Sequence, residues 1–463
     1  MHLENIYHKL PIALQNIGCS LVGWKICRTR FGPPFWRHLQ QAEQRAKWSD
    51  DRLLAYRDQR IREFVAHAAA TVPYYRRLFR EQGIDPRQIR TLDDLKQLPI
   101  LSKEEVQNHG RQMISDAVPP RQHIIAHTSG TTGGGLRFAT TLDAEQQQFA
   151  VWARYRRWHG VDLKDWCGYF GGRSVVPLSQ TCPPFWRYNR PGRHIFFSGY
   201  HLTPENLPHY AAELRRRQPP WIHGYPSLLA LLAAHLLDTR SDLGYRPGNV
   251  TVSAESLLSQ QAEIIERALG VRPTQHYGMA EAVANISECE RGKLHVDEDF
   301  AAVEFVPNPD GCGHKIVGTN FTNPATPLLR YDVQDTATLS DGPCSCGRPG
   351  RTIEDVDGRR EDYVVLKNGA RVGRMDHVFK DLINIREAQI YQQRAGEITI
   401  RVVRRDGYTP ADEEQLLRET RQRIGQDTKV LIQYVDGLER SPTGKLRFVI
   451  SDLQEGKLGQ PTG

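Results

Sequence analysis

The sequence lacks any apolar run long enough to cross a membrane, and it contains neither an internal repeat nor a low-complexity tract. A membrane-spanning helix needs about 20 mostly apolar residues. The nearest candidate, residues 10–24, is interrupted by Gln15 and Asn16. Because Glu4 and His8 precede this segment and no small-residue cleavage site follows it, we expect no secretory signal peptide.

Acidic residues are absent from Lys9 to Gln41. This lack of acidic residues would suit a surface-seeking amphipathic helix with peripheral membrane contact, but a helix that packs on the main domain is the favoured interpretation. Over the whole chain, 61 basic residues exceed 54 acidic ones, and the net charge is +7. Since the basic residues are scattered and form no stripe or known module, we expect no nucleic-acid partner but an anionic small substrate.

An extracellular disulfide framework is missing as well. The eight cysteines are spread through a long chain, which is typical of a reduced, cytoplasmic protein. Apolar residues make up 39% and charged residues 25% of the chain, as in an ordinary globular protein with a sizeable core.

A chain of 463 residues is too long for one compact core, so we expect two domains. Residues 1–125 have mostly helical periodicity. Strand–loop–helix units starting near residues 124, 220 and 249 predict a parallel sheet covered by helices. Ligands of such sheets gather at the C-terminal ends of the strands. Residues 294–366 favour strands and predict an antiparallel or barrel-like subregion.

The pattern changes again after residue 358 and predicts a small α+β domain. Its expected elements are a helix at 376–383, strands at 388–392 and 397–403, a helix at 412–424 and a strand at 429–435. The predicted fold class is therefore α/β, with a large N-terminal domain of several subdomains and a small C-terminal domain. The expected parts are residues 1–125, 126–357 and 358–463.

The segment His127-Thr-Ser-Gly-Thr-Thr-Gly-Gly-Gly135 combines four hydroxyl side chains with four glycines. Backbone N–H groups and hydroxyls in such a loop can surround phosphate oxygens. The common P-loop order GxxxxGK[ST] is absent. A glycine- and threonine-rich surface turn is the alternative interpretation of this segment alone.

Thr128-Ser-Gly-Thr-Thr-Gly133 resembles the phosphate loop of the adenylate-forming superfamily, which includes acyl-CoA synthetases, luciferases and peptide-synthetase adenylation domains. Five further segments match motifs of that superfamily in the same order. They are Ser253-Ala-Glu-Ser256, Tyr277-Gly-Met-Ala-Glu281, Arg330-Tyr-Asp-Val-Gln-Asp335, Gly358-Arg-Arg-Glu-Asp362 and Ser441-Pro-Thr-Gly-Lys445.

Within the superfamily the chain is similar to the phenylacetate–CoA ligase branch, and especially to its relatives associated with capsular polysaccharide biosynthesis. The features that carry this resemblance are Val72-Pro-Tyr-Tyr75, Leu98-Pro99 before Ser102-Lys103, Gly224-Tyr-Pro-Ser227, Pro327-Leu-Leu-Arg-Tyr331 and Cys344-Ser-Cys-Gly-Arg348.

The resemblance implies ATP-dependent activation of a small carboxylic acid as its adenylate, followed by transfer to a thiol such as CoA. Residues 1–125 and 126–357 would form the large domain with the ATP and acid sites, and 358–463 a mobile lid. The residues implied in ATP and AMP binding are Thr128, Ser129, Gly130, Thr131, Thr132, Gly133, Ser253, Ala254, Glu255, Tyr277, Gly278, Asp335 and Arg359.

Three of the implied roles are chemically specific. Asp335 would accept hydrogen bonds from the ribose, and Glu281 would be catalytic as a ligand of Mg²⁺. Lys445, a long ammonium side chain on a Pro-Thr-Gly loop, would be the catalytic cation that neutralises charge between the acyl and phosphate oxygens. The resemblance also implies a hinge at 358–362 that closes the C-terminal domain on the large one.

Two departures from the superfamily pattern stand out. Gly134-Gly135-Leu136-Arg137 replaces the frequent Pro-Lys continuation of the phosphate loop, so Arg137 only partly replaces that cation. Met279-Ala280 stands where a threonine is common, which removes a hydroxyl near the α-phosphate. Two alternatives stay open: adenylation with an amine or hydroxyl acceptor, for example on a sugar, and a non-catalytic binding protein of the same fold.

Cysteine and histidine residues also indicate a metal site. Cys289, His295, Cys344 and Cys346 are ligands suited to a tetrahedral, structural Zn²⁺. Cys312 and His314 are rival ligands, and reduced cysteines without a metal are the alternative.

Aromatic and polar residues follow the strand ends between residues 158 and 226 and are expected to line the acid pocket. In this pocket Arg173 or His201 would recognise a polar group of the acid, and Tyr225 would contribute to the lining. The aromatic content favours an acid that is more polar than phenylacetate.

Overall fold

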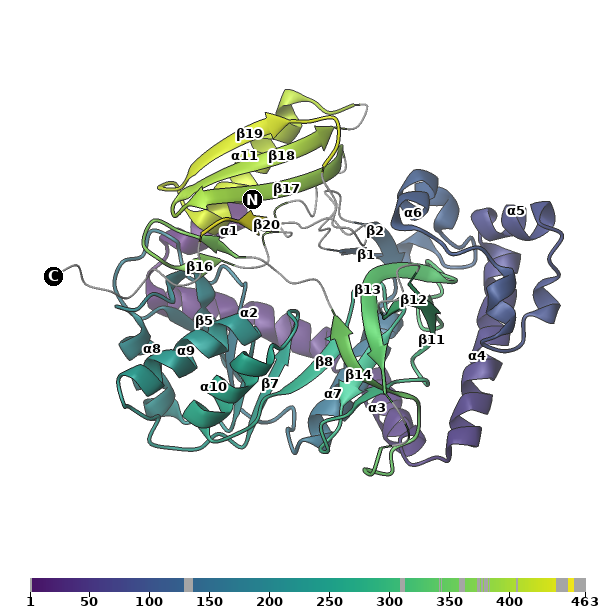
Figure 1. Ribbon diagram of the computed structural model, residues 1–463, viewed down its shortest axis with the longest axis horizontal. Helices are drawn as coiled ribbons and strands as arrows, with labels where there is room; N and C mark the ends of the chain where they lie inside the picture. Colours follow the sequence, from purple (N-terminus) through teal and green to yellow (C-terminus); the bar gives the residue numbers. More distant parts are fainter. Residues whose placement is uncertain are drawn as a thin grey trace.

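The structure is a computed structural model of the chain (Figure 1). It describes residues 2–128, 136–308, 313–340, 342, 344–357, 363–372, 375, 378, 382, 384–404, 407–438 and 449–453.

The N-terminal part of the chain is helical, as predicted. Ser49 caps α4 by accepting a hydrogen bond from the backbone N–H of Arg52, and Ser102 and Glu105 form a capping box at the start of α6. The helices are α1 (His2–Lys9), α2 (Ile12–Arg30), α3 (Pro33–Arg45), α4 (Asp50–Thr71), α5 (Pro73–Glu81) and α6 (Lys103–His109). No described helix combines the length and apolarity that a membrane span requires.

A twelve-stranded sheet runs through the molecule in the order β11-β12-β13-β14-β10-β9-β8-β7-β6-β3-β5-β4. Strands β5, β3, β6, β7 and β8 are parallel, and the other neighbours are antiparallel. The strands are β3 (Cys167–Gly171), β4 (Trp186–Asn189), β5 (His194–Ser198), β6 (Trp221–Gly224), β7 (Asn249–Ser253), β8 (Thr274–Gly278), β9 (Asn285–Glu288), β10 (Leu294–Val296), β11 (Ala301–Pro307), β12 (His314–Asn320), β13 (Tyr331–Leu339) and β14 (Thr352–Asp357).

Helices complete the strand–loop–helix units that the sequence predicts. Strand β6 leads into α9 (Pro226–Asp238), and β7 leads into α10 (Ser259–Leu269). Helices α7 (Leu142–Trp158) and α8 (Leu207–Arg217) belong to the same part of the chain. The β-rich zone is antiparallel as expected, but it continues the parallel strands through the β8–β9 pair and is not a separate sheet.

The prediction of a strand–loop–helix unit starting near residue 124 is wrong. Strand β1 (Ile124–His127) does not join the parallel sheet but pairs antiparallel with β2 (Arg137–Thr140), from His127 opposite Arg137 to Ile124 opposite Thr140. Residues 128–136, which separate the two strands in the sequence, are too few for the crossover of about a dozen or more residues that a parallel pair needs, so antiparallel pairing is the one available.

The C-terminal part forms a small α+β layer above the large sheet in the view of Figure 1. Its four-stranded sheet has the order β19-β18-β17-β20. The elements are β15 (Val364–Val365), β16 (Arg371–Val372), β17 (Ile385–Arg394), β18 (Glu397–Arg404), α11 (Pro410–Ile424), β19 (Lys429–Tyr434) and β20 (Val449–Ser451). The helix predicted at 376–383 lies mostly outside the described residues.

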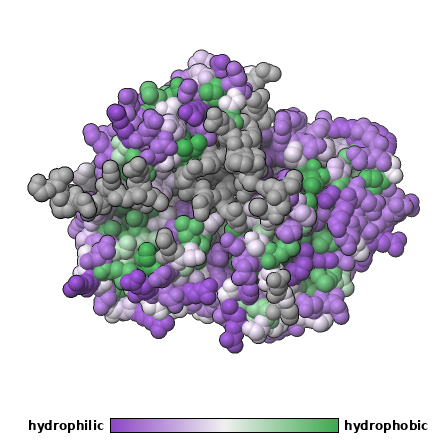
Figure 2. Space-filling model, viewed as in Figure 1, coloured by the Kyte–Doolittle hydropathy of each residue, from purple (hydrophilic) through white to green (hydrophobic). Residues whose placement is uncertain are grey.

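Each layer has its own apolar core. One core joins α4 and α5 to the antiparallel strands, a second joins the parallel strands to α8, α9 and α10, and a third lies in the C-terminal part. Tyr200, from the large sheet's side, belongs to this third core and accepts a hydrogen bond from Arg423 (3.2 Å). On the face drawn in Figure 2, apolar residues occur in small groups among hydrophilic ones.

Candidate functional site

Two of the predicted nucleotide motifs meet through a tyrosine–aspartate hydrogen bond. The hydroxyl of Tyr277, near the end of β8, donates to Asp335 Oδ2 on β13 at 2.8 Å, although the residues lie 58 positions apart. An irregularity in β13 positions Asp335, because Gln334 has a φ of 65° and the β12–β13 register shifts there. The motif ending in Asp335 is thus anchored to the end of a parallel strand.

The first residue of the same motif is structural. The buried guanidinium of Arg330 binds both carboxylate oxygens of Glu304 at 2.9 Å. Its backbone carbonyl also accepts a hydrogen bond from the N–H of Leu101 at 2.8 Å. These contacts hold the start of β13, and therefore the path of the strand toward Asp335.

The turn after β8 carries Glu281, which is buried. Gln148 on α7 donates to the carbonyl of Met279 (2.7 Å), and Asn320 on β12 donates to the carbonyl of Glu281 (3.2 Å). Gly278 lies close to Asn285 where the turn begins, because a Cβ there would lie 3.0 Å from Asn285 Oδ1 and the amide would have to shift. Neighbouring elements therefore fix the turn that presents Glu281.

The segment after β7 lies at the next strand end. Ala254 has a positive φ of 73°, and Glu255 Oε2 accepts a hydrogen bond from the backbone N–H of Ser227 (3.1 Å) in the first turn of α9. Ser253 Oγ lies 3.4 Å from His223 Nε2 on β6. Since β6, β7 and β8 are parallel neighbours, these contacts gather at one edge of the sheet.

Thr128 closes the base of the predicted phosphate loop. It is buried, its N–H donates to the carbonyl of Leu136, and its Oγ1 accepts from the N–H of Leu136, both at 2.9 Å. Arg137 follows as an exposed residue on β2. The other predicted residues of the loop and of the C-terminal domain lie outside the described residues: Ser129, Gly130, Thr131, Thr132, Gly133, Arg359 and Lys445.

Of the predicted acid-binding residues, Arg173 and Tyr225 come from adjacent strand ends. The Arg173 guanidinium lies over the rings of Phe196 (4.9 Å) and Tyr169 (5.8 Å). The N–H of Tyr225 donates to the carbonyl of Phe170 at 2.9 Å. The Tyr225 hydroxyl lies so near Gly172 that a Cβ there would be 3.1 Å away. Residues 172 and 173 therefore pack beside Tyr225.

His201 occupies a different environment. It is buried, its ring stacks on Phe185 with centroids 5.1 Å apart, and its Nδ1 lies 2.8 Å from Ser198 Oγ. Burial lowers the pKa of His201 to about 4. The imidazole is therefore neutral near pH 7, a hydrogen-bonding group without charge.

The sequence analysis did not single out Arg156, which lies in the short basic cluster of residues 154–157. Arg154 is paired with Asp297 (2.6 Å) and Asp299 (2.8 Å), so it is structural. The guanidinium of Arg156 instead lies over the ring of Trp221 at 4.9 Å. Burial lowers the pKa of Arg156, and the groups that partly offset this shift are Cys167, Tyr155 and Tyr169, with no carboxylate among them.

Arg30, at the end of α2, resembles Arg156. Its guanidinium lies 3.6 Å from the ring centre of Phe149, its Nε is buried without a hydrogen-bond partner, and burial lowers its pKa to about 10. Among the described residues, none forms a hydrogen bond or ion pair with the guanidinium of Arg30, Arg156 or Arg173. These three cations act together, because each lowers the pKa of His194.

Three histidines on the parallel strands, His194, His223 and His276, lie near enough to Arg156 for its charge to lower the pKa of each. Burial lowers the pKa of His194 to about 4 and that of His276 to about 3, and Arg156 contributes to the shift in all three. All three keep some solvent-accessible surface, as does Arg156. Side chains that line a recess are expected to be largely buried and yet to keep some surface accessible to solvent, as these histidines and Arg156 do.

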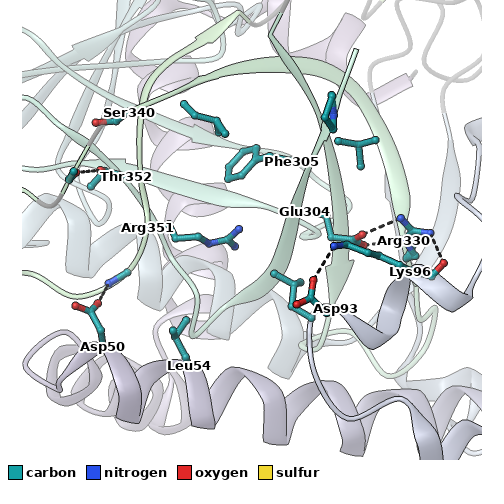
Figure 3. Close-up of a pocket in the computed structure, with 16 residues that line it drawn as sticks. Asp50, Leu54, Asp93, Lys96, Glu304, Phe305, Arg330, Ser340, Arg351 and Thr352 are labelled. Carbon is teal, nitrogen blue, oxygen red and sulfur yellow. Dashed lines mark hydrogen bonds and ion pairs between the residues drawn. The ribbon is translucent and has the colours of Figure 1, made fainter. Parts of the chain in front are cut away.

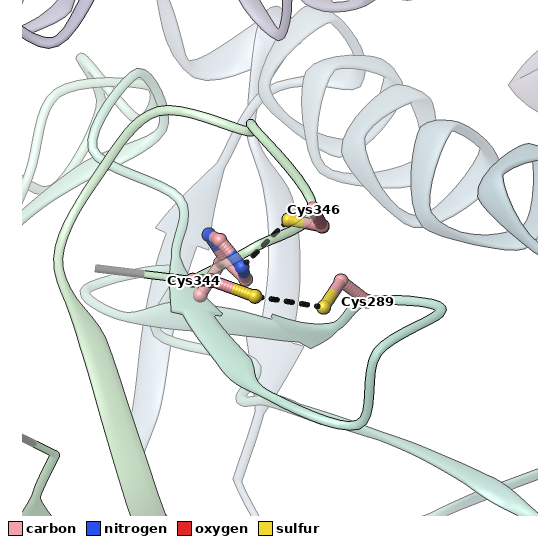
Figure 4. A group of neighbouring side chains, drawn as sticks. Cys289, Cys344 and Cys346 are labelled. Carbon is pink, nitrogen blue, oxygen red and sulfur yellow. Dashed lines mark hydrogen bonds between the residues drawn. The ribbon is translucent and has the colours of Figure 1, made fainter. Parts of the chain in front are cut away.

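Cys289, His295, Cys344 and Cys346 lie together, and their ligand atoms are all within 4.8 Å of one another (Figure 4). The Sγ atoms of Cys289 and Cys344 are 3.6 Å apart, and Cys346 Sγ is 3.3 Å from His295 Nε2. Tetrahedral zinc with bonds of about 2.3 Å to sulfur and 2.0 Å to nitrogen requires roughly 3.8 and 3.5 Å for such pairs. The four side chains fit the metal, and His314 is not part of the group.

A large groove of about 880 Å³ lies elsewhere, between α4 and the antiparallel strands (Figure 3). Its charged groups are engaged with neighbours: Arg330 with Glu304 at 2.9 Å, and Lys96 with Asp93 at 2.7 Å. Apart from the structural Arg330, it is lined by no residue of the nucleotide motifs. We therefore place the candidate site at the parallel strand ends and not in this groove.

Residues 364–452 match the family model of the CapK C-terminal domain. The chain is 25% identical to Protein CapK of Staphylococcus aureus, over 98% of this chain and 100% of that protein. It is 26% identical to phenylacetate-coenzyme A ligase of Thermus thermophilus (88% of this chain, 97% of that protein). It is 27% identical to the Escherichia coli phenylacetate-coenzyme A ligase (69% and 74%).

A solved structure of a 2-hydroxyisobutyryl-CoA ligase, in complex with 2-HIB-AMP and CoA, has the same fold. It aligns with a TM-score of 0.56 and 18% identity, over 88% of this chain and 91% of that chain. The similarity confirms the fold class. Together with the relatives above, it confirms the resemblance to the phenylacetate–CoA ligase-like branch and the prediction of an adenylate-forming ligase.

Proposed function

We propose that this relative of CapK and the phenylacetate–CoA ligases activates a small carboxylic acid with ATP and passes the acyl group to a thiol such as CoA. A carboxylate oxygen forms a bond to the α-phosphorus while the bond to the bridging oxygen of pyrophosphate breaks. The sulfur of the thiol, which loses its proton, then forms a C–S bond as AMP leaves. The observation that carries the proposal is the contact between Tyr277 and Asp335 at 2.8 Å, which joins two nucleotide motifs at the strand ends.

The chain's own residues would bind and orient the nucleotide. Asp335 accepts hydrogen bonds from the ribose, and the hydroxyl of Tyr277 holds that carboxylate in place. The segment from Ser253 to Glu255 contacts the base, while Glu281 would hold Mg²⁺. Such an ion supplies positive charge at the phosphates. Lys445 neutralises charge as the acyl–phosphate bond forms, with the C-terminal part closed on the large domain.

The acid would carry a second anionic or strongly polar group. Arg30, Arg156 and Arg173 form no ion pair with another described residue, although the nearby Glu145 partly offsets the lowering of the Arg30 pKa by burial. Cations removed from water in this way are costly unless an anion joins them. The recess-like setting of Arg156 and the neighbouring histidines supports placing that group there. Tyr225 and the aromatic rings under Arg173 would contact the acid's apolar part.

A structural Zn²⁺ belongs to the proposal as well. Burial raises the pKa of the Cys346 thiol to about 12, so this thiol would stay neutral without a cation. Because Cys344 and Cys346 lie between β13 and β14, Cys289 directly follows β9, and His295 lies in β10, the ion would tie the antiparallel strands together. We also propose a cytoplasmic location, since the seven described free cysteines suit a reducing compartment.

The test is ATP–pyrophosphate exchange across a panel of acids. One or more acids should stimulate exchange, and Lys445→Ala should reduce it by about 100-fold. Lys429→Ala, an exposed lysine of the same C-terminal part, is the matched control and should leave exchange unchanged. The proposal would be overturned if none of the acids stimulated exchange and the Lys445→Ala variant behaved as the parent protein does.

The acceptor is tested separately. With the best acid, added CoA should accelerate AMP release and yield a thioester. An amine or hydroxyl acceptor, for example on a sugar, is the alternative. Exchange without any thioester, but with an acyl-amine or acyl-ester product from sugar acceptors, would select that alternative.

A further inference from the structure

Helix α2 packs on the molecule with its polar side. Gln15 is buried and accepts a hydrogen bond from Arg187 Nε at 2.5 Å. Asn16 Oδ1 accepts from the N–H of Tyr188 (2.8 Å), and Ser20 Oγ donates to the carbonyl of Tyr188 (3.3 Å). These partners belong to β4, the edge strand of the large sheet. The helix therefore covers the unpaired edge of the sheet with hydrogen-bonding side chains.

Close packing continues at Gly23. A Cβ at this position would lie only 1.9 Å from Asn189 Oδ1, so any side chain would push α2 away from β4. Polar and small residues thus form the inner face of α2, the reverse of the usual pattern, in which a surface helix turns its apolar face to the core.

The outer face of α2 is apolar and exposed. Leu14 is 45%, Ile17 54%, Leu21 63% and Trp24 53% exposed. Their spacing of three, four and three residues places all four on one side of the helix. We call these four residues the α2 stripe. Val22, 59% exposed, lies beside it.

Basic residues accompany the stripe. Lys9, Lys25, Arg28 and Arg37 are exposed, and the sequence has no acidic residue from 9 to 41. The Arg28 guanidinium lies 5.4 Å from the Trp24 ring centre. An apolar stripe with an indole and flanking cations is complementary to the interface of an anionic bilayer, where acyl chains meet negatively charged headgroups.

We propose that α2 docks the protein onto a lipid bilayer that contains anionic headgroups, lying in the plane of the surface. The helix has 19 residues and is not apolar enough to span, so the stripe enters the headgroup boundary while its inner face stays on β4. A bilayer fits better than a protein partner, because cations border the stripe and residues 9–41 contribute no acidic side chain that could fix an orientation.

The test is co-sedimentation of the full chain with vesicles of phosphatidylcholine alone or with 30% phosphatidylglycerol. Binding should be at least tenfold stronger with the anionic lipid and should weaken in high salt. Leu21→Glu should reduce binding at least tenfold. Leu431→Glu is the matched control, because Leu431 is also an exposed leucine (53%, against 63% for Leu21) but lies on β19, so its substitution should not affect binding.

Both substitutions lie at exposed positions and should leave the fold intact. An unchanged thermal unfolding transition checks this for each variant. The proposal is overturned if the folded Leu21→Glu variant binds as the parent does, or if lipid charge has no effect. It is also overturned if the stripe joins two copies of the chain. In that case light scattering without lipid would show a dimer, and Leu21→Glu would dissociate it. Acid-dependent exchange is measured without vesicles, so this inference can fail without affecting the proposed reaction.

Discussion

At the residue scale, the site depends on pairs of side chains that lie far apart in the chain. Tyr277 and Asp335 meet through one hydrogen bond, and a tyrosine hydroxyl can orient a carboxylate without neutralising it. Arg156 and Arg173 share a cluster of aromatic rings, and neither has an acidic partner among the residues described. The first pair suits ribose binding, and the second suits an anion.

Removing these groups should change the use of ATP. Asp335→Ala should raise the KM for ATP by about tenfold or more, because a charged acceptor for the ribose is lost, while Tyr277→Phe should raise it less. ATP–pyrophosphate exchange at varied ATP measures both. Tyr391→Phe, which removes an exposed hydroxyl bonded to Asp452 at 2.5 Å, is the control. Equal KM values in all variants would contradict the ribose role.

The arginine cluster should determine which acids are used. Arg156→Leu should raise the KM for a dicarboxylic acid by about tenfold. The KM for the monoamide of the same acid should change little, because only the dianion has a second carboxylate that the Arg156 cation attracts. The KM for ATP should not change. Arg157→Leu is the control, since Arg157 pairs at the surface with Glu43 (2.8 Å) and Asp162 (3.3 Å). An equal loss with both acids would show a merely structural role.

At the element scale, loops between antiparallel strands are held by few interactions of their own. The segment between β13 and β14 carries Cys344 and Cys346, which reach Cys289 and His295 beside β10. A metal at this point would cross-link three strand ends. Helix α2 shows a second device at this scale, because its polar inner face covers the edge strand β4.

Loss of the metal should therefore loosen these strands. Cys344→Ser should abolish a stoichiometric zinc content measured by elemental analysis, and should lower the melting temperature by about 5 °C or more. Removal of zinc by a chelator should produce the same shift in the parent chain. Cys182→Ser changes an exposed free cysteine and should alter neither quantity. Parent protein that contains no zinc after metal-replete expression would contradict the assignment.

At the scale of the whole molecule, several buried histidines make folding sensitive to acid. The pKa values of His194, His201 and His276 are lowered by burial to about 4, 4 and 3. Each binds its proton more weakly in the folded than in the unfolded chain, where the pKa is about 6.5. Their contribution to stability is complete above pH 6.5 and is lost as the pH falls toward 4.

The free energy of unfolding should fall steeply between pH 6.5 and pH 4. One such histidine changes it by about 1.4 kcal/mol for every pH unit in this interval. Denaturant unfolding across the interval measures the slope, and His201→Gln should make it shallower even though it also disrupts stacking on Phe185. His235→Gln, half-buried on α9, is the control. A slope that His201→Gln leaves unchanged would contradict this origin.

Much of the architecture was predictable because its signals are local in the chain. The helices of the first part, the units β6–α9 and β7–α10 and the α+β character of the C-terminal part follow from periodicity and capping residues. The hairpin β1–β2 was not recognised, because the choice between parallel and antiparallel pairing depends on which strand lies alongside. The continuity of one sheet through β8 and β9 was missed for the same reason.

By itself, the sequence determined the order of the nucleotide motifs, the ligand types of the metal group and the lack of acidic residues around α2. Only the tertiary structure decided which side chains meet. It paired Tyr277 with Asp335, and it separated Arg154, bound to two aspartates, from Arg156, which pairs with no aspartate or glutamate in the described part of the chain. It also turned the apolar side of α2 outward. A motif consists of residues that are adjacent in the sequence, whereas burial and charge pairing depend on residues that only folding brings together.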